Sequence, residues 1–69
     1  MPLVPVSKHF FVSETAGRWT VAEGNRVFLF GDRRAAISEA LYLAHEERPA
    51  DVTVIEPNGD RRLIASYPL

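Results

Sequence analysis

The side chains suited to acid–base or metal chemistry are few and widely spaced along the chain. The two histidines are His9 and His45, and His45 is followed by Glu46 and Glu47. A metal site needs several converging ligands, and the sequence contains no His-Glu-x-x-His or comparable spacing. We therefore interpret His45-Glu46-Glu47 as the solvated last turn of a helix, and expect no metal centre and no cofactor.

Nucleophilic chemistry has equally little support. No serine lies in a Gly-x-Ser-x-Gly nucleophile elbow. The four glycines all fall at the ends of predicted elements, where turn geometry explains them, so there is no glycine-rich phosphate loop. Paired carboxylates need a cleft, which a single helix on a small sheet seldom builds. The sequence predicts a protein that is not an enzyme and has no catalytic residues.

Base stacking is the one chemistry for which the residue types are present. Aromatic rings lie near basic side chains in the predicted strands, as they do in sheets that bind single-stranded nucleic acid. The basic candidates are His9, Arg18, Arg26 and Arg62, and the rings are Phe11, Phe28 and Phe30. Against this, 9 acidic residues outnumber 8 lysines and arginines, whereas polyanion binding requires uncompensated cations. Nucleic-acid binding is kept as an alternative and ranked below protein association.

Size and composition place the chain among small folded domains. Its 69 residues make one domain, and a hydrophobic fraction of 46% with 25% charged residues argues against disorder. Cysteine is absent, so disulfides and thiolate metal sites are excluded together. In so short a chain, apolar burial barely exceeds the entropy cost of ordering. Oligomerisation is the remaining common source of extra stability.

Charge and hydropathy give a default location. The net charge of −1 provides no field that would draw the protein to nucleic acid or an anionic membrane. No apolar run approaches the roughly 20 residues that span a bilayer. Residues 1–7 contain Pro2 and Pro5 without the basic and apolar regions of a signal peptide, so we expect an extended N-terminal arm and a cytoplasmic protein.

The remaining residues, 8–69, are predicted to form one domain. Alternating apolar residues, aromatic and β-branched side chains, and turn residues predict strands, with tight turns at Gly24-Asn25 and around Asn58-Gly59. Helical spacing predicts one helix, which Asp32 caps and Pro49 ends. The expected strands cover residues 8–13, 18–23, 26–30, 52–56 and 61–67, and the helix covers 33–47.

This order, strand-strand-strand-helix-strand-strand, predicts an α+β fold of two layers. One helix lies on one face of a mainly antiparallel five-stranded sheet. If Trp19 and Val21 face the helix, simple alternation along each strand places eight more residues on the helix side. They are Phe10, Val12, Val27, Leu29, Val52, Val54, Leu63 and Ala65. The opposite face then presents Phe11, Phe28, Phe30, Ile55 and Ile64, with His9, Arg18, Arg26 and Arg62 among them.

An apolar face of this size needs a partner or a cover. Our leading hypothesis is an interaction module that self-associates, as a dimer, through Phe11, Phe28, Phe30, Ile55 and Ile64. A ligand or nucleic-acid platform is one alternative. The other is that bulges alter the alternation and the N-terminal arm covers the rest.

Several motifs resemble those of a small bacterial family of unknown function. They are Phe11-Val12, Gly17-x-Trp19-x-Val21, the helix from Ala36-Ile37 to Ala44, the hairpin at Asn58-Gly59 and the final Ser66-Tyr67. The helix start differs, because Asp32-Arg33-Arg34-Ala35-Ala36 stands where that family usually has a threonine cap followed by Glu-Ala. The resemblance implies a fold but no activity, cofactor or catalytic residue.

The element order is also similar to that of antitoxins whose N-terminal half imitates a degraded nuclease fold. The proline-rich signature that these antitoxins carry between strands is missing here. An antitoxin-like protein partner is therefore the weaker alternative.

Overall fold

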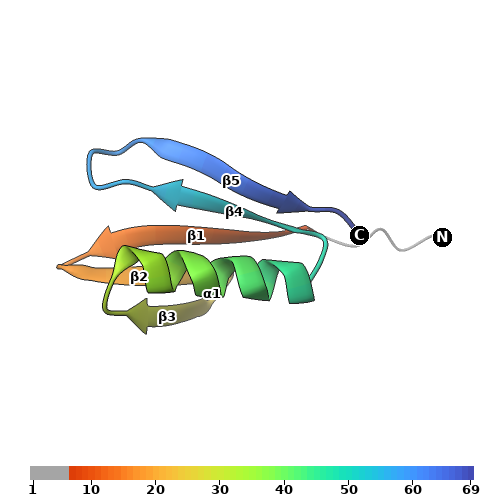
Figure 1. The fold of residues 1–69 in the computed structure, drawn as a ribbon, viewed down its shortest axis with the longest axis horizontal. Helices are drawn as coiled ribbons and strands as arrows, with labels where there is room; N and C mark the ends of the chain where they lie inside the picture. Colours follow the sequence, from red (N-terminus) through yellow and green to blue (C-terminus); the bar gives the residue numbers. More distant parts are fainter. Residues whose placement is uncertain (1–6) are drawn as a thin grey trace.

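The computed structural model describes residues 7–69, which form a two-layer α+β domain (Figure 1). Residues 1–6, most of the predicted arm, lie outside the described part of the chain. The elements are β1 (Lys8–Thr15), β2 (Arg18–Glu23), β3 (Arg26–Phe30), α1 (Arg33–Glu46), β4 (Ala50–Ile55) and β5 (Arg61–Tyr67). Their order confirms the predicted fold class.

The sheet has the strand order β3-β2-β1-β4-β5. Three neighbouring pairs are antiparallel, but β1 and β4 are parallel, so the sheet is mixed. The parallel pair follows from the path of the chain. The strand β3 runs in the direction of β1, α1 returns across one face, and β4 then runs beside β1 in the same direction.

The core lies between α1 and the three central strands of the sheet. Ala36, Ala40 and Ala44 follow one another at a spacing of four residues and are fully buried. Their small side chains let the helix approach the sheet closely, and alanine is also the best helix former. They meet the fully buried strand residues Phe10, Val12, Val21, Val52 and Val54.

Two hairpin turns of two residues each determine which residues face α1. Gly17 and Gly24 adopt positive φ in these turns, a conformation in which glycine is unstrained. Because the second turn contains only Gly24 and Asn25, Glu23 pairs with Arg26, and odd-numbered residues of β2 pair with even-numbered residues of β3.

The predicted orientation of β3 was therefore wrong. Phe28 lies opposite Val21 and Phe30 opposite Trp19, so both rings are on the helix side and pack against the core. Val27 and Leu29, which were expected beneath the helix, lie on the other face of the sheet and are 64% and 60% exposed.

A bulge changes the alternation in β5 as well. Val52 pairs with Ala65 and Thr53 with Leu63, so Ile64 is the extra residue and is 41% exposed. Ala65 lies on the helix side, as predicted. Leu63 lies on the opposite face and Arg62 is paired with Val54 on the helix side, which reverses the prediction for both.

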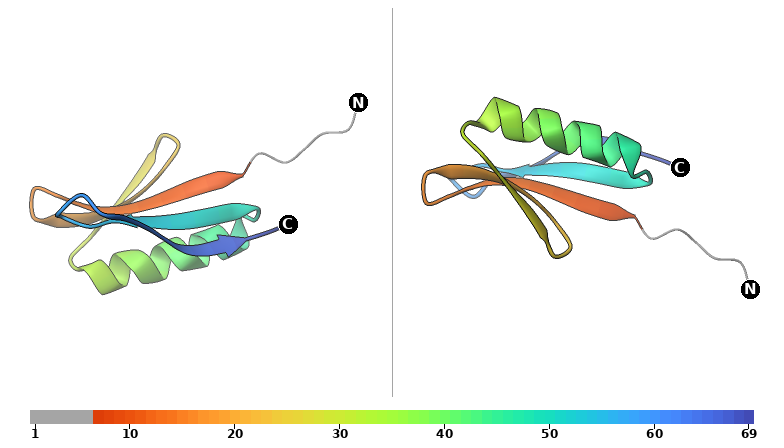
Figure 2. Two further views of the ribbon diagram at one scale, coloured as in Figure 1. Left: turned by 90° about the horizontal axis from the view of Figure 1, so that it is seen from above. Right: turned by 90° about the horizontal axis from the view of Figure 1, so that it is seen from below.

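Two further views show that α1 covers one face of the sheet and that no other described element covers the opposite face (Figure 2). The β2–β3 hairpin twists away from the helix. Within residues 7–69, no helix has the length and apolar character needed to cross a membrane.

The fold makes a prediction about stability. Phe10 is fully buried under α1, so we expect Phe10→Ala to lower the free energy of unfolding by about 3–5 kcal/mol. Tyr42, which is 60% exposed on α1, provides the control. Tyr42→Ala should change the free energy of unfolding by less than about 0.5 kcal/mol. Urea denaturation followed by circular dichroism measures both. Equal losses in the two variants would contradict this core.

Candidate interaction surface

The face of the sheet opposite α1, here called the open face, carries an apolar band across all five strands. Strand pairing arranges the residues of the open face in two parallel rows, each of which crosses the strands. The first is Val27, Ala22, Phe11, Thr53 and Leu63, and the second is Leu29, Thr20, Ser13 and Ile55. Val27, Leu29 and Leu63 are more than half exposed. The band therefore presents branched aliphatic side chains to solvent at both margins.

Two hydroxyl groups inside this band, those of Ser13 and Thr20, are bonded to each other. Thr20 Oγ1 lies 3.3 Å from Ser13 Oγ and also donates to the Ser13 carbonyl oxygen at 3.3 Å. Thr20 is only 9% exposed. Because these polar atoms already have partners within the chain, covering the band would not leave them unsatisfied.

Charged groups lie at the two ends of the open face. At the hairpin end, Arg18 is paired with Thr15, and Arg61 is paired with Ile55. At the other end, His9 Nδ1 lies 3.0 Å from each carboxylate oxygen of Asp51. The open face is therefore basic at one end and carries an acidic group at the other.

The sequence-predicted interface residues are divided between the two faces. Phe11 and Ile55 lie on the open face and are half-buried. Phe28 and Phe30 lie on the helix side, and Ile64 occupies the bulge. Val27, Leu29 and Leu63 were predicted on the helix side and lie on the open face instead. Applying the two-residue turn rule to Gly24-Asn25 would have placed Val27 and Leu29 correctly.

The four basic residues proposed for nucleic-acid binding are not brought together. His9 and Arg18 lie at opposite ends of the open face, and His9 is paired with a carboxylate. Arg62 lies on the helix side, and so does Arg26. Phe11 remains as the one phenylalanine of the three candidates on the open face, which weakens a stacking platform.

Arg26 belongs to an ion cluster that joins the end of α1 to the sheet. Its Nη2 lies 2.6 Å from Glu47 Oε1, and its Nε donates to Glu23 Oε1 at 2.8 Å. Lys8 Nζ approaches Glu47 Oε1 to 2.7 Å. The guanidinium also lies 5.9 Å from the centre of the Phe10 ring. This cluster links α1 to β1, β2 and β3, and we assign it a structural role.

The cluster strongly favours the charged forms of its members. Hydrogen bonds from Arg26, and then from Lys8, lower the pKa of Glu47 to about 2 from a usual 4.5, and the bonds with Glu47 and Glu23 raise the pKa of Arg26. At the other end of α1, Arg33 Nη2 lies 2.7 Å from Glu56 Oε2 and lowers the pKa of Glu56. Both ends of the helix are thus tied to the sheet by ion pairs.

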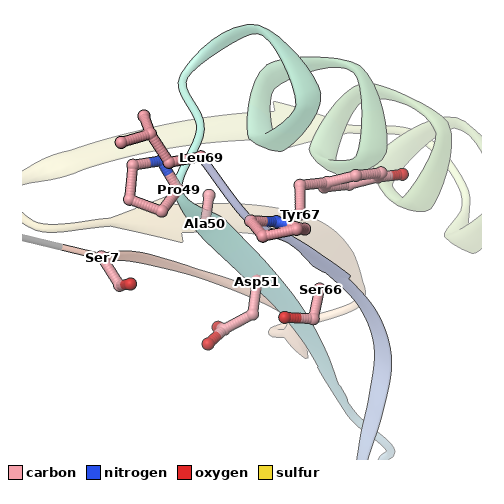
Figure 3. A pocket seen from close by; sticks show the side chains of 8 residues that line it. Ser7, Pro49, Ala50, Asp51, Ser66, Tyr67 and Leu69 are labelled. Carbon is pink, nitrogen blue, oxygen red and sulfur yellow. The ribbon is translucent and has the colours of Figure 1, made fainter. Parts of the chain in front are cut away.

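A hollow of about 420 Å³ lies where the sheet ends near the C-terminus (Figure 3). Asp51 and Ser66 are paired there on neighbouring strands. The rest of its lining is Ser7, Pro49, Ala50, Tyr67, Pro68 and Leu69. The hollow is open, and His9, which is bonded to Asp51, is exposed. Water therefore reaches both His9 and Asp51. No cluster of three or more His, Cys, Asp or Glu residues suited to a metal occurs among residues 7–69.

The ion cluster predicts a particular dependence of stability on pH. A lowered pKa means that Glu47 stabilises the fold above its usual pKa of 4.5, and that this contribution is lost as the pH falls towards about 2. We expect Glu47→Gln to be less stable than the unmodified protein at neutral pH and to lose less stability on acidification. The loss of stability that is due to Glu56 should remain. Urea midpoints measured from neutral pH into this acidic range test this expectation.

Glu46 supplies the matched control, because it is the adjacent glutamate and is exposed. Glu46→Gln should keep the acid sensitivity of the unmodified protein. An unchanged pH profile in Glu47→Gln would contradict the structural role of the cluster.

Comparison with known proteins adds no family to this description. No protein-family model, no curated protein and no solved structure matches the chain. The resemblance to a bacterial family of unknown function therefore stays a prediction.

Proposed function

We propose that this protein is a non-enzymatic interaction module that self-associates by packing the open faces of two copies together. The observation that carries the proposal is the exposure of Val27, Leu29 and Leu63, at 64%, 60% and 65%, on the face opposite the helix. These side chains flank Phe11 and Ile55 on the same face, so apolar side chains are present from β3 to β5.

Burying these side chains in a dimer offsets the cost of association. Fully burying a valine or leucine side chain contributes about 1.5–3 kcal/mol. Two copies contribute six such partly exposed side chains, so the gain is comparable with the roughly 4–15 kcal/mol that association costs in lost freedom. The hydroxyls of Ser13 and Thr20 add no penalty, because they bond to each other.

Charge supports a second copy as the occupant and favours one direction of its strands. If the strands of the two copies run in opposite directions, Arg18 and Arg61 of one copy approach the Asp51 end of the other. If the strands run in the same direction, arginines meet arginines. Face-to-face packing of sheets at about 10 Å with a modest rotation accommodates the opposed arrangement.

The structure gives less support to the two alternative functions. Single-stranded nucleic-acid binding requires aromatic rings and cations on one surface, whereas Phe28, Phe30, Arg26 and Arg62 lie on the helix side. The antitoxin-like alternative depends on the order of elements alone. We keep a cytoplasmic location within the proposal, because small secreted domains usually depend on disulfides and this chain contains no cysteine.

The proposal predicts the effect of a charge placed in the band. Leu63→Lys keeps the fold, because the side chain is exposed, but puts a cation in the packed face. We expect it to weaken self-association by at least about tenfold, which is about 1.4 kcal/mol. Sedimentation velocity over a range of concentrations measures the change.

Tyr42→Lys is the control, since it introduces the same charge on the outer side of α1 and should leave self-association unaltered. The proposal fails if the unmodified protein is monomeric at tens of micromolar.

A further inference from the structure

The strand β3 forms one edge of the sheet, and its outer side has no neighbour among the described residues (Figure 1). Edge strands are usually protected by bulges, prolines or outward charges, because their free backbone groups can pair with another chain. The opposite edge, β5, has such features: a bulge and the exposed Arg61 and Arg62. By contrast, β3 reads Arg-Val-Phe-Leu-Phe, pairs with β2 without a bulge, and has its one charged residue bound to Glu23 and Glu47.

The pairing with β2 determines which backbone groups of β3 are free. Glu23 and Arg26 flank a two-residue turn, so they form a pair that exchanges both hydrogen bonds. Bonded and non-bonded pairs alternate along an antiparallel ladder. Phe28 and Phe30 therefore bond to β2, whereas the N–H and C=O groups of Val27 and Leu29 point away from the sheet.

We infer that β3 pairs with β3 of a second copy in an antiparallel arrangement, with Phe28 opposite Phe28 on the two-fold axis. This register pairs all five residues of the strand. It also places Val27 of each copy opposite Leu29 of the other, so that the four outward N–H groups donate to the four outward carbonyls. A register centred on Val27 or on Leu29 satisfies fewer of these groups and shortens the pairing.

The side chains suit the same register. On the open face, Val27 and Leu29 of one copy lie beside Leu29 and Val27 of the other, which joins the two apolar bands. On the helix side, the two Phe28 rings are a non-bonded pair, in which side chains approach most closely. Arg26 lies opposite Phe30 of the second copy, and its guanidinium is already 6.0 Å from the centre of the Phe28 ring.

This edge pairing goes beyond the proposed function, because it uses a different surface. Its two-fold axis is perpendicular to the sheet, whereas the axis for packing open faces lies in the plane of the sheet. Where the two perpendicular axes also intersect, the two isologous interfaces together generate a closed tetramer. Either interface can form without the other, so the two are tested separately.

Amide hydrogen exchange tests the edge pairing directly. We expect the amides of Val27 and Leu29 to be protected at high protein concentration and to lose that protection on dilution. The amide of Phe28 bonds within the chain and should stay protected throughout, which makes it an internal control. Leu63→Lys should retain the concentration-dependent protection, because Leu63 lies at the far side of the sheet from β3.

A pair of variants at one position separates backbone from side chain. Leu29→Pro removes the outward N–H but no bond to β2, and proline is tolerated at such edge positions. Leu29→Ala removes the side chain and keeps the N–H. Both substitutions are made in the Leu63→Lys variant, in which packing of the open faces is weakened. There we expect Leu29→Pro to raise the dissociation constant of the edge-paired dimer at least about tenfold more than Leu29→Ala does.

The outcomes distinguish the inference from the proposed function. An assembled protein whose Val27 and Leu29 amides exchange freely would overturn the edge pairing and leave the open-face proposal standing. Concentration-dependent protection of these amides in Leu63→Lys would support the edge pairing whatever happens at the open face. Should Leu29→Pro fail to fold, hydrogen exchange in the unmodified protein still decides the question.

Discussion

A single helix can cover only one face of a five-stranded sheet, and the rest of this structure follows from that constraint. The three buried alanines of α1 bring the helix close to the sheet, so the core is a thin layer of valines and Phe10. The apolar side chains that point the other way have no cover within residues 7–69. The exposure of Val27, Leu29 and Leu63 is the direct consequence of a sheet with two apolar faces and one helix.

The charged residues serve mainly to hold this one helix in place. Glu47 and Arg26 connect the end of α1 to the sheet, and Arg33 and Glu56 connect its beginning. These groups lie on the helix side or at its margins, where they neutralise each other. Arg26 was a candidate for binding an external anion, but its guanidinium is occupied by two carboxylates. The open face is left with few charges, and these lie at its two ends.

The surfaces available for a partner are thus the open face and the edge of β3. Both are self-complementary in a simple physical sense. The open face has Arg18 and Arg61 at one end and Asp51, with its partner His9, at the other. The edge of β3 has as many outward donors as acceptors, at Val27 and Leu29. A domain of 69 residues without cysteine gains stability when either surface is covered, because its own core is small.

The sequence alone determined the elements and the fold class. The aromatic and β-branched runs, the turn glycines, the Asp32 cap and the helical spacing of Ile37, Ala40, Leu41 and Ala44 are local signals, and each one acts through its own neighbours in the chain. The orientation of β3 was also encoded locally, since the two-residue turn at Gly24-Asn25 requires Phe28 to pair with Val21, but simple alternation overlooked it.

Only the tertiary structure decided the rest. The bulge at Ile64 interrupts the alternation within the β4–β5 hairpin. The parallel pairing of β1 with β4 and the meeting of Lys8, Arg26 and Glu47 join residues far apart in the sequence. No local pattern specifies such contacts, because they depend on how the helix lies across the sheet. That packing settled which apolar side chains are buried and which remain available to a partner.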